Sequence, residues 1–427
     1  MSIYDTLFAE TQIPQVVPVE YNLPRGEISR DMVPQKVEQT IEQSNVLQKI
    51  KPGQTIAIAA GSREISNIDL VVKQLADMLL KAGAKPFIIP AMGSHGGATA
   101  QGQKEILAGY GITEEAMGIP IRATMDTVPI GETPSGLRVC IDRYADEADG
   151  IIPVGRIKAH TDFRGKIESG LMKMLAIGCG KQYGAHICHT MGFPSMSKNV
   201  TEIARVILEK KVVPFGIGIL EDAFHNTYQI QAVAGEVMEQ TEEELLVIAK
   251  KLVPCIPFEK IDVLVLEEIG KDISGAGMDP NVTGRSIMLG SSKPFVERIA
   301  VLDLSEKSHH SGAGIGGADV TTRRFFSKMD LDITYPNGIT SHDPQSIKIP
   351  AIMPNDRDAI RMALQTCVHN DPKLGYRMVM MKNTLHLNRF FISTALMEEA
   401  KKHPDLTIVG QAQDIVFDAN GNLPHLA

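Results

Sequence analysis

Residues 55–111 read, in order, TIAIAA (55–60), IDLVVKQLADMLLKAG (68–83), KPFIIPA (85–91) and TAQGQKEILAGYG (99–111), separated by short polar loops. Short apolar runs here alternate with longer stretches of helical periodicity, and this alternation is typical of parallel strands joined by crossover helices. Further strand candidates lie at 150–157, 213–220, 261–268 and 297–304. We therefore predict a doubly wound α/β fold with mainly parallel sheets.

A chain of 427 residues is too long for one ordinary core and favours two domains. The stretch LVPCIPFEK (252–260) contains two prolines, follows a charged helix and precedes a new strand, as expected of a domain boundary. We predict a catalytic α/β domain over 1–255 and a second α/β domain over 256–405, with the active site in the cleft between them. The tail, 406–427, is predicted to form a strand pair and to pack back on the first domain.

Charge and composition exclude several classes of function. The net charge of −8 argues against a surface that follows nucleic-acid phosphates. No apolar run reaches the roughly 18 residues of a membrane span, and the start, MSIYDTLFAE, lacks the order of a signal peptide. The five cysteines include no CxxC pair. We expect a cytoplasmic protein that acts on a small molecule and binds neither nucleic acid nor membrane.

Polar clusters follow three of the predicted strands, namely GSRE (61–64), GSHGGAT (93–99) and RIKAH (156–160). Ligands of open parallel sheets bind where the strands end, because loops and helix N-termini meet there. Arg63 could clamp a carboxylate, while His95 and His160 could transfer protons near neutral pH. Each residue alone is more often a surface or capping residue, but three of them in successive loops favour an active site.

The segment HTDFRGKIESGLMKMLAIGCGKQYGAHICHTMG (160–192) carries the densest set of reactive side chains. Cys179, His186, Cys188 and His189 are of the types that zinc or nickel accepts. Their spacing matches no common zinc motif, and the adjacent Cys188 and His189 would point apart. A zinc-dependent hydrolase or lyase using Cys179, His186 and His189 nevertheless stays open as an alternative.

The predicted second domain has its own cluster after the strand at 261–268. The glycines of this loop permit close approach of backbone to a ligand, and Arg285 could bind a carboxylate or phosphate. We consider Arg285 a substrate-binding candidate and three neighbours cofactor-binding candidates: Asp279, Asn281 and Thr283. A long turn with Asx caps explains the same residues.

A second glycine-rich stretch lies in the same predicted domain. The GxGxxG match within SGAGIGGAD (311–319) does not directly follow a strand, so it predicts a flexible loop rather than a dinucleotide site. A non-enzymatic protein that binds a nucleotide or sugar acid through such loops is a further alternative.

The order of these residues resembles that of the nickel-dependent lactate racemase superfamily. An arginine lies in the first strand-end loop, a histidine follows the next strand, and a histidine, a lysine and another histidine come after it. The likeness is strongest from about residue 55 to 190. It implies a nickel pincer nucleotide, pyridinium-3-thioamide-5-thiocarboxylic acid mononucleotide carrying Ni. The group would be tethered to a lysine and its nickel bound by one protein histidine. The resemblance also implies cofactor-maturation enzymes as partners, and a homo-oligomer is compatible with it.

Carried over residue by residue, the resemblance assigns Arg63 to the substrate carboxylate and His95 and His160 to acid/base work. It assigns Lys173 to the cofactor tether and His189 to nickel. The interval of 16 residues between Lys173 and His189 favours His189 over His186 as the metal ligand. One histidine would take the hydroxyl proton of a 2-hydroxy acid while the cofactor accepts a hydride from the α-carbon.

The chain also departs from the family pattern. Ala60 and Gly61 stand where the family has an acidic residue and a histidine, and Glu64 replaces a proline. Thr283, Gly284 and Arg285 replace a Tyr-Gln pair and a later lysine. Because these positions face substrate in the family, we predict a racemase or epimerase of a 2-hydroxy acid other than lactate, such as a polyol acid epimerised at one carbon.

Overall fold

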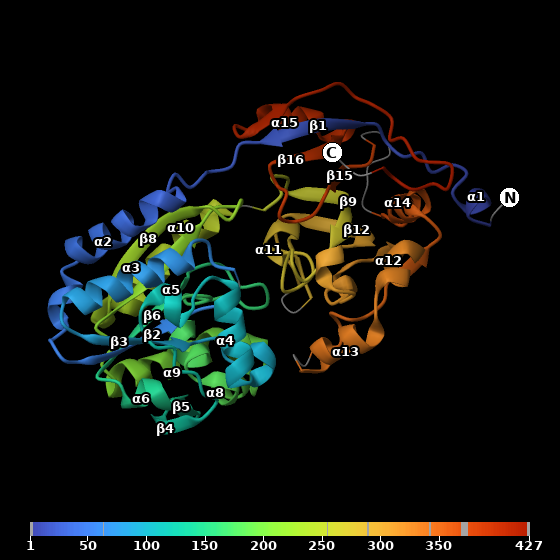
Figure 1. Ribbon diagram of the computed structural model, residues 1–427. Helices are drawn as coiled ribbons and strands as arrows, with labels where there is room; N and C mark the ends of the chain where they lie inside the picture. Colours follow the sequence, from blue (N-terminus) through green and yellow to red (C-terminus); the bar gives the residue numbers. More distant parts are fainter. Residues whose placement is uncertain are drawn as a thin grey trace. The chain divides into compact units, whose positions relative to one another are not determined.

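The computed structural model describes residues 3–62, 64–253, 255–287, 290–340, 343–368 and 375–424. The chain divides into two compact units, each an α/β domain with its own sheet (Figure 1). The continuous unit is Pro24–Leu252, and the discontinuous unit joins Met1–Leu23 to Val253–Ala427. The predicted α/β class with mainly parallel sheets is confirmed.

The continuous unit is built on a five-stranded sheet in the order β3-β2-β6-β7-β8. All neighbouring strands are parallel except the β7–β8 pair, which is antiparallel. The strands are β2 (Thr55–Ala60), β3 (Lys85–Pro90), β6 (Gly150–Arg156), β7 (Phe215–Glu221) and β8 (Thr227–Ala234). A separate hairpin consists of β4 (Thr127–Glu132) and β5 (Arg138–Asp142).

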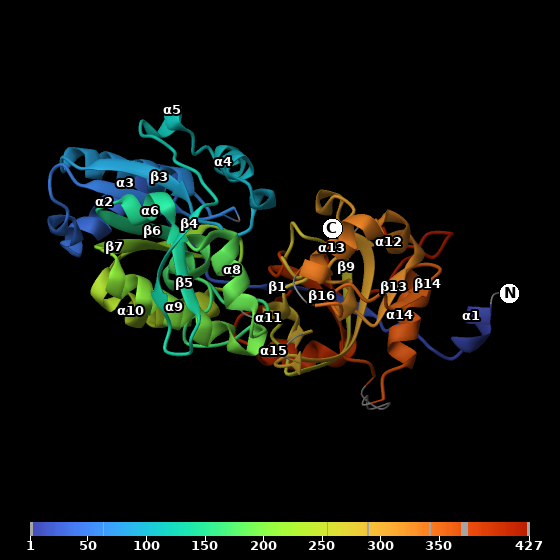
Figure 2. The same cartoon turned by 90° about the horizontal axis from the view of Figure 1, so that it is seen from below.

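Helices cover both faces of this sheet. They are α2 (Val33–Gln43), α3 (Ile68–Lys81), α4 (Ala100–Gly109), α5 (Glu114–Met117), α6 (Arg143–Glu147), α7 (Leu171–Lys173), α8 (Lys181–His189), α9 (Met196–Lys210) and α10 (Met238–Leu252). Figure 2 shows α3 and α10 on opposite sides of the sheet. This is the doubly wound arrangement that the alternating sequence pattern predicts.

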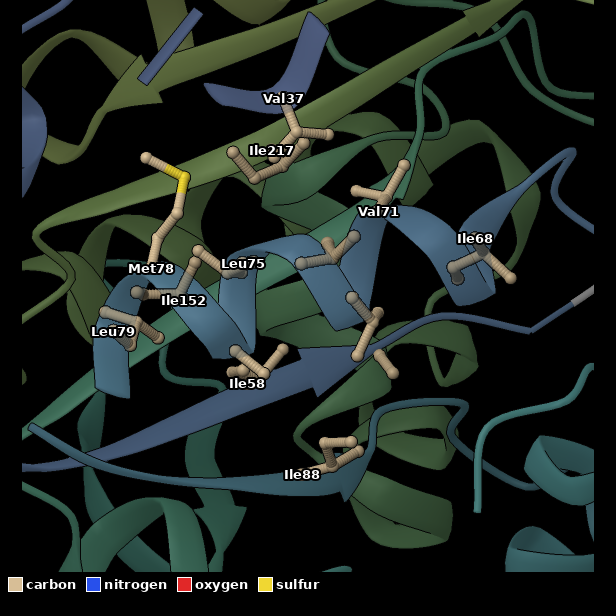
Figure 3. Packing of buried hydrophobic residues seen from close by; sticks show 14 of the residues in the cluster. Val37, Ile58, Ile68, Val71, Leu75, Met78, Leu79, Ile88, Ile152 and Ile217 are labelled. Carbon is tan, nitrogen blue, oxygen red and sulfur yellow. The ribbon is translucent and has the colours of Figure 1, made fainter. Parts of the chain in front are cut away.

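One core lies between the sheet and α2 and α3. Apolar residues of α3 recur at helical spacing at Ile68, Val71, Leu75 and Leu79, and all are buried. They pack with Val37 of α2 and with isoleucines of four strands, as Figure 3 shows: Ile58, Ile88, Ile152 and Ile217. Burial of each such side chain contributes about 1.5–3 kcal/mol. This core holds together the sheet that carries the candidate site at the carboxyl ends of its strands.

On the other face, glycines in β7 let helices approach the sheet closely. A Cβ at Gly216 would lie 3.0 Å from Leu171 and 3.1 Å from Met238, and one at Gly218 would lie 2.7 Å from Ile157. α7 and α10 therefore pack directly on β7. This contact places α10 next to the segment that carries the candidate site.

The discontinuous unit has an eight-stranded sheet in the order β14-β13-β12-β9-β15-β16-β1-β17. The five strands from β14 to β15 are parallel to their neighbours, and the pairings of β16 with β15, of β1 with β16 and of β17 with β1 are antiparallel. The strands are β1 (Val16–Tyr21), β9 (Lys260–Ile269), β12 (Phe295–Leu304), β13 (Val320–Thr322), β14 (Ala351–Met353), β15 (Met378–Met381), β16 (Arg389–Ser393) and β17 (Leu406–Ile408).

This unit also has a short ladder of β10 (Arg285–Ser286) with β11 (Gly290–Ser291). Its helices are α1 (Ile3–Leu7), α11 (Pro280–Thr283), α12 (Arg323–Lys328), α13 (Leu331–Thr340), α14 (Asp356–Gln365) and α15 (Met397–Lys402). In the described part of the chain, no helix is both long and apolar enough to span a bilayer.

The limits of the two units differ from the predicted domains at both ends of the chain. Residues 1–23, expected in the first domain, supply β1, which pairs with β16 and β17 of the other unit. The tail is predicted to pack on the first domain, but it packs on the discontinuous unit. There β17 pairs with β1, and the backbone of Gln413 forms hydrogen bonds with that of Val16. Local sequence predicts a strand but does not specify its partner, and here the partners lie more than 350 residues apart. The boundary near residue 252 falls at the start of the predicted stretch 252–260.

The glycine-rich loop at 311–319 is packed, although the sequence predicted a flexible loop. Gly314 has a φ of +100°, and a Cβ there would lie 1.9 Å from the carbonyl oxygen of Ala276. Gly277, on the facing loop, is similarly close to Ala313. These glycines let two loops of the discontinuous unit cross in contact, which is a structural use of the residue.

Candidate active site

The first strand-end histidine, His95, follows β3 and is partly buried. Its Nδ1 lies 2.8 Å from the hydroxyl oxygen of Ser62, which follows β2. Gln103 of α4 donates from its side-chain amide to the carbonyl oxygens of Gly93, at 2.8 Å, and His95, at 3.3 Å. His95 is thus held between the ends of two neighbouring strands, as the sequence predicted for a strand-end cluster.

The second histidine, His160, lies in the loop between β6 and α7, which we call the His160 loop (residues 157–170). Lys158 and Ser169 close its base through paired backbone hydrogen bonds of 2.9 and 3.2 Å. The backbone N–H of His160 donates to Glu168 Oε2 at 2.7 Å, and its carbonyl accepts from Arg164 at 2.5 Å. Backbone contacts on both sides therefore fix the position of this residue.

The imidazole of His160 is oriented by its neighbours. Its ring stacks on Phe163 with centroids 4.1 Å apart. Its Nδ1 accepts the backbone N–H of Asp162 at 3.0 Å, and the Asp162 carboxylate lies 3.8 Å away. Because a backbone N–H only donates, the neutral ring carries its proton on Nε2 in this arrangement.

Lys173 ends the short helix α7 and is followed at once by a π-helical turn, Met174–Gly178. Its ammonium lies 5.7 Å from the centroid of the Phe163 ring, the same ring that stacks on His160. The structure therefore brings His160 and Lys173 together around one buried aromatic side chain. Single π-helical turns inside helices are frequent at functional sites.

Glycines at the strand ends let this helical segment lie across the edge of the sheet. The side chain of Met174 occupies the space over Gly61 after β2 and Gly155 in β6. A Cβ at Gly178 would lie 2.7 Å from the carbonyl oxygen of Ala91, and Gly93 donates to Gly178 at 3.3 Å. The segment that carries Lys173 thus touches the first two predicted strand-end clusters, at Gly61 and Gly93, and lies over Gly155, the residue before the third.

A buried carboxyl supports the start of α7. Glu242 of α10 accepts the backbone N–H groups of Met172, at 2.9 Å, and of Leu171. A Cβ at Gly170 would lie 2.3 Å from this carboxyl, so the glycine leaves room for it. Burial raises the pKa of Glu242 to about 7. A carboxyl at a helix N-terminus satisfies otherwise unpaired N–H donors.

A buried ion pair lies next to the site. Lys181, at the start of α8, and Asp142, at the end of β5, are both fully buried, with their charged atoms 2.9 Å apart. Lys181 also donates to the carbonyl of Pro90 at 2.5 Å and to Gln103 at 3.2 Å. Burial raises the pKa of Asp142, and Lys181 opposes that rise. The pair joins α8 to the end of β5, and the bond from Lys181 to Pro90 joins α8 to the end of β3, just before the His95 loop.

The arrangement of the cysteines counts against the zinc alternative. Cys179 and Cys188 are buried, and burial raises the pKa of each thiol to about 12, whereas a zinc ligand must be a thiolate. His186 is exposed on α8. Within the described ranges, no three His, Cys, Asp or Glu side chains come together in a group that could hold a metal ion.

His189 lies in the last turn of α8, partly buried, with its ring edge-on to Phe193 at 5.5 Å. A metal at this histidine needs donor atoms from outside the described protein residues. The pincer nucleotide implied by the sequence would supply such donors, and the partly buried Lys173 amine would supply its attachment. The residue types present therefore fit that group.

The second-unit candidates have structural contacts. Asp279 caps α11 by accepting from the backbone N–H of Asn281 at 2.8 Å, and Thr283 is fully buried. The guanidinium of Arg285 donates to Asp319 at 2.5 Å and to the carbonyl oxygens of Gly317, Val296 and Glu297. The Asx-cap alternative describes this turn, and the contacts favour a structural role for Arg285 over substrate binding. Asp319 is 34 residues away in sequence, so the pairing was not visible there.

Arg63 was predicted to bind the substrate carboxylate, and it lies outside the described residues. Its neighbour Ser62 contacts His95. No sequence motif points to Glu168, Phe163 or Glu242, because each is far in sequence from some of its contacts or is of an ordinary type in a polar loop. Glu168 shares its loop with a second carboxylate, Asp162, so composition alone does not single it out.

Comparison with known proteins finds one matching family. Residues 5–200 match the family described as the lactate racemase N-terminal domain. No curated protein matches the chain. The chain is similar to a solved structure of the lactate racemase apoprotein from Thermoanaerobacterium thermosaccharolyticum, with 15% identity and a TM-score of 0.45 over 66% of this chain and 74% of that one.

The fold and site define a two-unit α/β protein with histidines and a lysine gathered at the carboxyl edge of a parallel sheet. Residues 5–200, which include His95, His160, Lys173 and His189, are similar to the lactate racemase N-terminal domain family. This similarity supports a racemase or another isomerase.

Proposed function

We propose that this protein is a racemase or epimerase of a 2-hydroxy acid that works with a nickel pincer nucleotide. The observation that carries the proposal is the meeting of the His95 loop, the His160 loop and the Lys173 segment at one sheet edge, inside the residues that match the family. Ala60, Gly61 and Glu64 stand where the family carries other residues facing substrate, and this difference favours a hydroxy acid other than lactate. In this proposal the protein binds its substrate in the cytoplasm, and maturation enzymes supply the cofactor.

In this proposal Lys173 forms the covalent attachment and His189 is the protein ligand of nickel. When bound, that group would supply hydride chemistry at the α-carbon of the substrate, so that no poorly acidic C–H proton need be removed by a protein base. Arg63 pairs with the substrate carboxylate, for which a guanidinium has a matching pair of donors. Phe163 provides an apolar wall beside the lysine.

His95 and His160 hold and move the hydroxyl proton. A serine hydroxyl can donate or accept, so Ser62 is compatible with either neutral tautomer of His95, and His95 can accept a proton without rearrangement. His160 rests with Nδ1 accepting a backbone N–H. Protonation of Nδ1 would exchange that bond for an ion pair with the Asp162 carboxylate, 3.8 Å away. This favours His95 as the first proton acceptor and His160, with its proton on Nε2, as the donor.

Chiral chromatography tests the proposed activity directly. Protein produced together with the maturation enzymes is incubated with single enantiomers or epimers of a panel of 2-hydroxy acids, and the appearance of the other form is measured. We expect conversion of at least one acid, and a loss of 10²- to 10⁴-fold in kcat for His95→Gln and for His160→Gln. Nickel-loaded protein that converts no member of a broad panel would contradict the proposal.

A further inference from the structure

Glu168 is a buried carboxylate that binds the backbone of His160 and takes no part in the proposed reaction. Glu168 is fully buried and stands at the end of the His160 loop. It accepts from the backbone N–H of His160 at 2.7 Å through Oε2 and from that of Gly165 at 3.2 Å through Oε1. Lys250 of α10 donates to the same Oε1 at 2.7 Å. A buried charge is tolerated only when it is paired and hydrogen-bonded, and Glu168 satisfies both conditions.

The shape of the loop explains why its backbone needs this support. Residues 159–168 leave the sheet after the Lys158–Ser169 bridge and return to it, so their N–H groups have no strand partner along the described loop. Glu168 reaches across the loop and binds the N–H groups of two of its residues. Gly165 must be a glycine, because a Cβ there would lie 1.9 Å from the hydroxyl of Ser197.

Fixing the backbone of His160 also fixes its ring. Two contacts that orient the ring, the stack on Phe163 and the N–H from Asp162 to Nδ1, are made by residues of the same loop. If the loop backbone shifts, both contacts shift with it. Lys250 connects this arrangement to α10, which also supplies Glu242 to the N-terminus of α7.

We propose that Glu168, held by Lys250, is the positioning residue that sets the place and tautomer of His160. The proposal rests on the function proposed above, because it is there that His160 acts on substrate. Glu168 itself does not touch the reacting atoms: it acts through the backbone of His160. A displacement of about 1 Å in a catalytic group lowers the rate on the order of 10²-fold.

The test uses the full-length protein, loaded with cofactor, and a graded pair of variants. Glu168→Gln keeps the size of the side chain, but its amide group can accept through only one atom, so at least one of the three donors loses its acceptor. Lys250→Met removes only the ammonium of a side chain that is 40% exposed, and leaves both backbone bonds. The matched control is Lys166→Met, in the same loop, whose ammonium lies 3.0 Å from Glu243 of α10 in an exposed pair.

Two measurements do not depend on activity. Hydrogen exchange followed by mass spectrometry measures how fast the backbone amides of the His160 loop exchange. We expect these amides to exchange at least tenfold faster in Glu168→Gln than in wild type, and at an intermediate rate in Lys250→Met. Lys166→Met should exchange at the wild-type rate. Nitrogen-15 NMR of labelled histidine reports the tautomer of His160, which should be Nε2–H in wild type and mixed in Glu168→Gln. Unchanged exchange and tautomer in Glu168→Gln would overturn the positioning role even if the enzyme is active.

The kinetic measurement separates positioning from general loss of structure. We expect Glu168→Gln to lower kcat 10- to 100-fold with KM within about threefold of wild type and with unchanged cofactor mass on Lys173. A raised KM with unchanged kcat would overturn the role. If wild type shows the predicted exchange and tautomer but converts no hydroxy acid, the function proposed above fails while the loop geometry stands.

Discussion

Among single residues, we expect the largest loss of unfolding free energy when the Lys181–Asp142 pair is broken. Both side chains are fully buried, so Lys181→Met leaves the Asp142 carboxylate without its countercharge. We expect this variant to lose about 3–5 kcal/mol of unfolding free energy in urea titrations. The control, Lys73→Met, breaks an exposed pair with Asp77 and should lose less than about 1 kcal/mol. Equal losses for the two variants would refute this account of the buried pair.

Glu242 makes the stability of the folded protein pH-dependent. Its pKa is raised from 4.5 to about 7 by burial, so the folded state keeps a proton that the unfolded chain releases. The contribution of Glu242 is therefore most favourable at low pH and falls as pH rises from about 4.5 to about 7. Relative to Glu242→Gln, which cannot titrate, wild type should lose roughly 3 kcal/mol of unfolding free energy across that range.

Urea titrations of wild type and Glu242→Gln at pH values on both sides of the range measure this difference. Glu244→Gln serves as the control, because Glu244 lies on the exposed face of the same helix and should leave the pH profile of wild type unchanged. A difference between wild type and Glu242→Gln that stays constant with pH would show that Glu242 does not titrate in this range.

Residue types at strand ends could be predicted from sequence, and their contacts could not. His95 and His160 follow β3 and β6 as the strand pattern predicts, because every parallel strand ends at the same edge of the sheet. Arg285 has an equally suggestive sequence position, but Asp319 and three carbonyl groups occupy its guanidinium. Glu168 was overlooked because its role lies in hydrogen bonds to backbone groups, which no sequence pattern shows.

At the scale of elements, the π-helical turn Met174–Gly178 depends on a glycine. The alanine of Gly178→Ala would place a Cβ 2.7 Å from a backbone oxygen, that of Ala91, which cannot move cheaply. We expect a loss of about 1–3 kcal/mol in unfolding free energy, as for overpacked cores. Gly109, in α4, has open space around it, and Gly109→Ala should be neutral or stabilise by up to about 1 kcal/mol. Thermal unfolding of both variants measures the contrast, and a neutral Gly178→Ala would contradict it.

Element types were more predictable than their partners. The strands predicted at 150–157, 213–220, 261–268 and 297–304 are all present as β6, β7, β9 and β12. β1 was not predicted, although Val17 and Val19 are fully buried, because a run of six residues at the start of a chain carries little signal alone. Its place between β16 and β17 comes from long-range pairing.

At the scale of the whole molecule, the pairing of β1 predicts how the chain can be divided. The fragment 24–252 keeps the complete five-stranded sheet and its core, so we expect it to fold by itself. Deletion of residues 1–23 from the full chain removes β1 from between β16 and β17 and should destabilise the discontinuous unit alone. Hydrogen exchange on both proteins, compared with the full chain, measures this. An unfolded 24–252 fragment would contradict the assignment of the units.

The central claim is that this chain holds its cofactor through Lys173, and peptide mass mapping tests it most directly. The protein is produced with the maturation enzymes, digested, and the peptide that contains Lys173 is weighed alongside those of Lys173→Ala and Lys166→Ala. The account predicts the added mass of the nucleotide on Lys173 in wild type and Lys166→Ala, with nickel bound, and neither in Lys173→Ala. An unmodified Lys173 in wild type, in cells that load a known lactate racemase, would contradict it.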